Sequence, residues 1–166
     1  MAGLSGTDKA RRGEFVARAA AALLAGAVAI VLNTGALAAA DLVPLATAQG
    51  GLLRFLGMLT GGAVAVPAGA MFQTGFHIAV GLAMALFYAF ALEPVLRGPS
   101  WQRGLIYALA VWLANAAIVL PATGEGFAGS RHLSLAGMTW FAAAHTLFFV
   151  VLAVLYARLR AGRELG

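Results

Sequence analysis

The sequence predicts an all-α protein: a membrane four-helix bundle with a short amphipathic surface helix in its first outer loop. The first reason is composition, since 62% of the residues are hydrophobic and only 10% are charged, with a mean hydropathy of +0.91. Soluble domains of similar size carry about a quarter charged residues. The second reason is the length of four apolar stretches, and the third is the uneven distribution of basic residues around them.

Four stretches are long and apolar enough to cross a bilayer. A spanning helix needs roughly 20 mostly apolar residues, because every backbone amide must find its partner within the segment once water is gone. We expect one transmembrane domain over residues 1–166, with four helices at about 15–40, 68–92, 105–120 and 137–157.

Basic residues orient these helices. Most of the 11 lysines and arginines fall at helix ends that share one side of the membrane: Lys9, Arg11, Arg12, Arg18, Arg97, Arg103, Arg158, Arg160 and Arg163. Only Arg54 and Arg131 fall on the other side. The positive-inside rule then predicts cytoplasmic termini, in a bacterial inner membrane. Since insertion and anionic lipid account for the net charge of +5, we expect the bilayer and no nucleic acid as a partner.

The N-terminus has a competing interpretation. Its basic start, its apolar run and the small residues around Ala36 and Ala38 also resemble a cleavable signal peptide. The run from Phe15 past Ile30 is longer than the roughly 7–15 residues of a signal-peptide core. We therefore expect a retained first helix, and cleavage stays the alternative.

The first outer loop contains a second helical pattern, at about residues 45–59. Leu52, Leu53, Leu56 and Leu59 recur close to helical spacing, with Arg54 as a polar interruption. This pattern predicts a short helix lying on the outer membrane surface. Pro67 is expected to start the next spanning helix, where a missing amide donor costs least.

Several short motifs lie between residues 53 and 159: Phe76-His77-Ile78-Ala79-Val80-Gly81, Arg103-Gly104, Pro121 with Gly124-Glu125-Gly126, Ala144-His145-Thr146, and Tyr156. With these motifs the chain resembles a family of uncharacterised bacterial four-helix integral membrane proteins, a domain of unknown function. The resemblance implies the architecture and a part for His77 and His145. It implies no reaction.

Polar residues inside the predicted helices gather at one level. Counted at about 1.5 Å per residue from the outer boundary, Asn33, His77, Asn115 and His145 share a depth of roughly 8–13 Å. Polar side chains in membrane helices are costly and face the bundle interior. We define the polar layer as these four residues together with their neighbours Gln73 and Thr146.

Three interpretations of the polar layer remain open. In the first, the side chains only hydrogen-bond between helices, at about 0.6 kcal/mol per pair. In the second, His77 and His145 are the axial ligands of a b-type haem. In the third, the layer forms an outward-facing pocket that binds a small solute, a quinone headgroup or a proton.

No pattern in the sequence predicts an enzyme. We find no Ser-His-Asp arrangement, no paired carboxylates and no His-Glu metal motif, and the absence of cysteine excludes a thiolate site. We therefore expect no catalytic residue and no metal site. The 21 glycines and abundant alanines allow close helix packing, within the chain and against partners. The primary expectation is an accessory or scaffold subunit that associates with other membrane proteins or with itself.

Overall fold

The computed structural model describes residues 3–43, 45–47, 50–61 and 69–164, and it confirms the predicted fold class. Helices, turns and short irregular stretches make up these residues, without a strand among them. Four helical rods are long and apolar enough to span a membrane, so the chain is a multi-pass membrane protein. The elements are α1 (Gly3–Ala40), α2 (Gly51–Leu59), α3 (Ala70–Phe87), η1 (Tyr88–Leu92), α4 (Ser100–Ala114), η2 (Asn115–Val119), α5 (Leu120–Ala122), η3 (Phe127–Gly129) and α6 (Leu135–Glu164).

Three of the four spanning helices are longer than the apolar runs that predicted them, while the second ends at Leu92 as predicted. Helix α1 begins at Gly3 rather than near residue 15, the third rod covers Ser100–Ala122, and α6 extends from Leu135 to Glu164. An apolar run indicates only the part of a helix that lies in the hydrocarbon core. The backbone hydrogen bonds of the helix continue into the polar residues on either side of that run. Helix α2 begins at Gly51, so its predicted start at residue 45 is wrong, because residues 45–47 are non-helical. The expectations for Pro67 and residue 68 fall outside the described residues.

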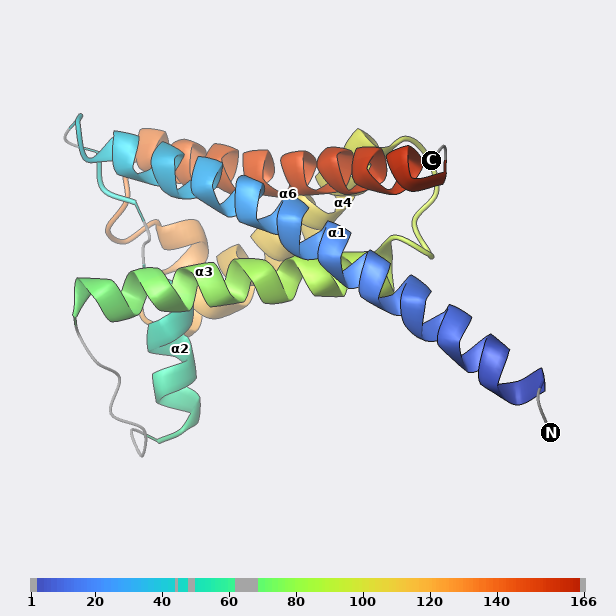
Figure 1. The fold of residues 1–166 in the computed structure, drawn as a ribbon. Helices are drawn as coiled ribbons and strands as arrows, with labels where there is room; N and C mark the ends of the chain where they lie inside the picture. Colours follow the sequence, from blue (N-terminus) through green and yellow to red (C-terminus); the bar gives the residue numbers. More distant parts are fainter. Residues whose placement is uncertain (1–2, 44, 48–49, 62–68, 165–166) are drawn as a thin grey trace.

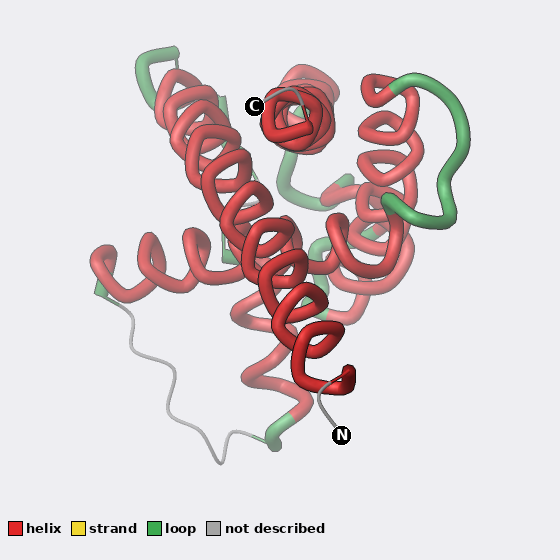
Figure 2. Tube along the Cα trace, turned by 45° about the vertical axis from the view of Figure 1, so that its right-hand side comes forward, coloured by secondary structure: helices red, strands yellow, loops and turns green. Residues whose placement is uncertain are grey.

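The bundle is built around α6. Helix α6 packs between α1 and α4, and α1 also packs against α3 (Figure 1). Both termini lie toward the same end of the bundle, which we call the terminal end. At the opposite, distal end, α1 finishes and α3 begins, and α2 runs crosswise to α3 (Figures 1 and 2).

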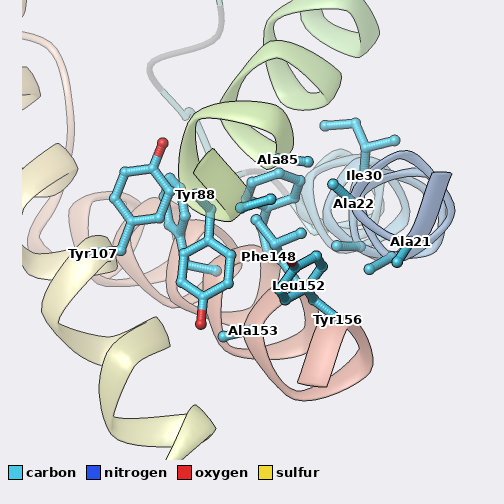
Figure 3. Close-up of a cluster of buried hydrophobic side chains, with 14 of the residues drawn as sticks. Ala21, Ala22, Ile30, Ala85, Tyr88, Tyr107, Phe148, Leu152, Ala153 and Tyr156 are labelled. Atoms are coloured by element: carbon cyan, nitrogen blue, oxygen red, sulfur yellow. The ribbon is translucent and has the colours of Figure 1, made fainter. Parts of the chain in front are cut away.

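An aromatic core fills the terminal half of the bundle (Figure 3). The ring of Tyr107 lies 4.3 Å from that of Phe149 and 6.1 Å from that of Tyr88, measured between centroids. Tyr88 meets the ring of Tyr156 edge-on at 5.8 Å. The Tyr107 hydroxyl also donates a hydrogen bond to the carbonyl of Met84 at 3.3 Å, which ties α4 to α3.

Small residues permit this packing. A Cβ on Gly104 would lie 2.7 Å from the backbone oxygen of Phe149 and 2.8 Å from the Cα of Val150, so only glycine lets α4 approach α6 this closely. On α1, buried alanines face α3 and α6, including Ala22 and Ala25. These small residues therefore serve contacts within the chain.

An ion cluster closes the terminal half. The carboxylate of Glu93 lies 3.1 Å from Arg103 and 3.8 Å from Arg18. Arg18 also donates to the carbonyl of Ala89 at 2.7 Å and lies over the ring of Phe90. Three rods are thus joined through one acidic side chain.

Each π-helical segment ends two residues before a proline. Segment η1 ends at Leu92 before Pro94, and η2 ends at Val119 before Pro121. Proline has no N–H, and its ring clashes with the carbonyl four residues earlier. The preceding turn widens instead to i→i−5 hydrogen bonds. Segment η2 begins at Asn115, a member of the polar layer.

A second ion cluster fastens α2 at the distal end. Arg54 of α2 lies 2.8 Å from the carboxylate of Glu125, and Nδ1 of His132 lies 2.6 Å from its other oxygen. Helix α2 also contacts η2 and α5. The cluster therefore holds the first turn of α2 against the distal half of the third rod.

A candidate binding cavity lined by the polar layer

The distal half contains a cavity of about 370 Å³. Its walls come from α1, α3, α6 and the third rod (α4, η2 and α5), and the first turn of α2 covers one side. Along α3 it extends from Ala70 to Met84, which corresponds to about 21 Å at 1.5 Å per residue. Volume and length together suit a slender molecule.

Five of the six polar-layer residues line this cavity: Asn33, Gln73, His77, Asn115 and His145. They come from four different rods of the fold. Thr146 shares their depth but does not line the cavity, and its hydroxyl donates to the carbonyl of Ala142 at 2.8 Å within its own helix. The structure therefore brings five of the six predicted residues together around one cavity, and Thr146 lies outside its lining.

A chain of hydrogen bonds links three helices through Asn33, whose exposed fraction is 1%. Nδ2 of Asn33 donates to the carbonyl of Ala144 in α6 at 2.8 Å. Its Oδ1 lies 2.9 Å from Nε2 of His77 in α3. Since an amide oxygen can only accept, the proton in this bond belongs to Nε2 of His77. The first interpretation of the polar layer, hydrogen bonding between helices, is thus present at these residues.

His145 makes a different contact. Its Nδ1 lies 2.8 Å from the carbonyl of Phe141, one turn earlier in α6, and its ring stacks obliquely on that of Phe141 at 4.2 Å. Nδ1 must donate, because a carbonyl oxygen only accepts. Within the part of the chain that the structure describes, Nε2 of His145 has no hydrogen-bond partner. This nitrogen belongs to a residue that lines the cavity.

Asp41 lines the distal mouth of the cavity and was not among the site residues predicted from the sequence. It directly follows α1 and is the one charged side chain among the described lining residues. The sequence signal was its seven-residue spacing from Thr34, which also lines the cavity, since that spacing puts both on one helical face. The mouth of the cavity thus carries a negative charge.

The other end of the cavity is apolar. Ile30, Val80, Met84 and Phe149 lie there, beyond the two histidines as seen from Asp41. Most binding pockets combine such apolar walls with a few polar groups that fix orientation. The end beyond the histidines is therefore apolar, whereas the half toward Asp41 combines polar side chains with apolar ones such as Leu37 and Phe76.

The geometry gives little support to a haem held by both histidines. Histidine normally offers its free Nε2 as the axial ligand, and Nε2 of His77 already donates to Asn33. Among the described residues, no group of three or more histidine, aspartate or glutamate side chains could hold a metal ion. At His77 the geometry thus favours hydrogen bonding over axial ligation.

Fold and site define a helical multi-pass membrane protein with an amphipathic internal cavity. Comparison of the chain with protein-family models, with curated proteins and with solved structures finds no match.

Proposed function

We propose that this membrane protein binds a small amphipathic molecule in the cavity between α1, α3, η2 and α6. The observation that carries the proposal is the cavity of about 370 Å³, lined by polar side chains from four helices at one level and by apolar side chains beyond them. If these polar side chains served only to pack the helices together, we would expect them to be in close contact rather than to surround a cavity. Polar groups in a membrane interior commonly mark a ligand or ion pathway.

The size of the cavity bounds the ligand. Binding pockets for small molecules have volumes of about 300–1,000 Å³. A cavity of about 150 Å³ accommodates benzene, so 370 Å³ accommodates roughly 15 non-hydrogen atoms. A ring with a short apolar tail fits this size, with the ring near the histidines and the tail toward Met84.

A binding experiment with a cavity-filling variant tests the proposal. The detergent-purified protein is titrated with 4-hexylphenol, which has about 13 non-hydrogen atoms and so suits this volume. Binding is measured by isothermal titration calorimetry. Val80→Trp places a larger side chain at the apolar end, and we expect it to abolish binding. The control, Ile78→Trp, lies on the same helix but not in the cavity lining, and it should bind normally. Equal binding by both variants would refute the proposed site.

The same proposal places Asp41 and the mouth of the cavity on the outer side of a bacterial inner membrane, as the distribution of basic residues suggests. We also propose, as the sequence motifs indicate, that the chain is related to the uncharacterised four-helix membrane proteins that it resembles. Because the chain has no cysteine, Ser130→Cys and Gly162→Cys give clean labelling sites. In intact cells an impermeant maleimide should label only the first. Labelling of only the second would reverse the orientation.

An accessory or scaffold role stays a prediction beside this proposal. Its support was the abundance of small residues, and those at Ala22, Ala25 and Gly104 make contacts inside the chain. Purification in mild detergent tests it, since a subunit should copurify with its partner. The same sample tests the haem alternative: a Soret band that shifts on reduction would support it, whereas a colourless protein would count against it.

A further inference from the structure

We infer that the ligand of the proposed site is an amphiphile whose polar head carries a hydroxyl group that donates a hydrogen bond to Nε2 of His145. The inference rests on the proposed function and narrows its ligand class. It depends on where the protons of the two histidines lie, which two backbone carbonyls determine.

The carbonyl of Ala144 sets the direction of the first hydrogen-bond chain. It can only accept, so the atom of Asn33 that faces it at 2.8 Å is the amide nitrogen. The other amide atom is then the oxygen, and the Nε2 of His77 that faces it at 2.9 Å carries a hydrogen. The bonds of Asn33 are thus complete within the protein, while Nδ1 of His77 keeps a lone pair for which no donor is found among the described residues.

The carbonyl of Phe141 determines which nitrogen of His145 carries the proton. It accepts from Nδ1 of His145, so the neutral imidazole keeps its lone pair on Nε2. Among the described residues no donor faces this lone pair. His145 therefore presents an acceptor to the cavity that it lines, and a ligand that offers a donor matches it.

A hydroxyl group matches the remaining lining better than a carbonyl does. The other polar lining comprises the amides of Gln73 and Asn115 and the hydroxyls of Thr34 and Thr74, which both donate and accept, and the carboxylate of Asp41, which like Nε2 of His145 only accepts. A hydroxyl donates to one neighbour and accepts from another. A quinone head offers acceptors only, so we assign the site to the hydroxyl-bearing form, a quinol or another phenol.

The test compares two ligands of nearly equal shape, 4-hexylphenol and its methyl ether, 4-hexylanisole. They differ in the hydroxyl hydrogen, which the ether lacks. Losing one hydrogen bond to a desolvated acceptor should weaken binding of the ether to the unmodified protein by about tenfold. Equal affinities would overturn the inference while leaving the proposed cavity intact. Binding of neither compound would count against both.

A variant then assigns the preference to His145. His145→Phe keeps a flat ring and removes the lone pair, so the ratio of the two affinities should fall to about one. Thr146→Val is the matched control, because Thr146 is adjacent in sequence, bonds only within its helix and does not line the cavity. It should keep the full ratio. A purely structural role of His145 would lower both affinities together and preserve the ratio, which would overturn the assignment.

Discussion

Nε2 of His77 donates a hydrogen bond to Oδ1 of Asn33, and the two residues join α3 to α1 at a distance of 2.9 Å. Nδ2 of Asn33 in turn donates a hydrogen bond to the backbone carbonyl of Ala144 in α6. One buried amide therefore connects three of the four spanning rods, at the level where the cavity separates their side chains. Both its donor and its acceptor are used, so its removal leaves two partner groups unsatisfied.

Asn33→Leu, which keeps a similar side-chain volume, should lower the free energy of unfolding by about 1–3 kcal/mol, because His77 and Ala144 lose their partner in a desolvated site. The measurement is reversible unfolding by SDS in mixed micelles. Thr146→Val serves as the control and should change the free energy by less than about 0.5 kcal/mol. Equal effects of the two variants would contradict the structural role of Asn33.

Gly104→Ala should destabilise the protein by about 1–3 kcal/mol, because the new Cβ would overlap the backbone of α6 at Phe149 and Val150. Gly75→Ala is the matched control in α3, where a Cβ meets nothing within 4 Å. That substitution should be neutral or slightly stabilising, since alanine favours a helix over glycine. Thermal unfolding followed by circular dichroism distinguishes them. A stable Gly104→Ala protein would refute the close approach of α4 and α6.

Glu93→Gln should lower stability by about 1–2 kcal/mol, because Arg18 and Arg103 then face each other without the carboxylate that separates them. Glu14→Gln is the control. Glu14 is 62% exposed and lies 3.9 Å from Arg160, and such surface pairs contribute less than about 1 kcal/mol. The same SDS unfolding assay serves both variants. An equal loss of unfolding free energy in Glu14→Gln and Glu93→Gln would show that the Glu93 cluster stabilises the protein no more than a surface ion pair does.

Glu125→Gln should loosen the first turn of α2, because Arg54 and His132 both bind its carboxylate. The measurement is the maleimide reaction rate of a cysteine introduced as Leu53→Cys, at a buried position that lines the cavity. We expect severalfold faster labelling. Arg131→Gln, which removes only a bond to the carbonyl of Gly124, should leave the rate unchanged. No acceleration in Glu125→Gln would show that other contacts hold α2.

The number of spanning helices and much of the cavity lining could be predicted from the sequence, for different reasons. Apolar length reports directly on the lipid environment. Depth along a helix axis placed Asn33, His77, Asn115 and His145 at one level, and all four line the cavity. Depth says nothing of rotation about the axis, however. Thr146 is turned by about 100° from His145, and this rotation takes it away from the cavity.

Other features could not be read from local patterns. The two π segments require hydrogen bonds that skip a residue, and the prolines at 94 and 121 indicated only where a regular helix is disturbed. Asp41 was not among the predicted site residues, because its place in the cavity lining depends on how α3 packs beside the end of α1. The contact of Glu125 with Arg54 joins the loop after α5 to helix α2, which lies far away in the chain, and periodicity does not relate the two.

The aromatic core and the Glu93 cluster fasten the rods at the terminal end, whereas the distal end is held by the hydrogen bonds of Asn33, by that of Trp140 to the carbonyl of Ala36, and by the contacts of α2. Resistance to local opening is therefore graded across the thickness of the bilayer. Backbone amides near Tyr156 should exchange hydrogen only through global unfolding, while those near His77 exchange through smaller openings. A molecule entering from the lipid would meet the half of the bundle that yields first, and its binding there would slow this exchange.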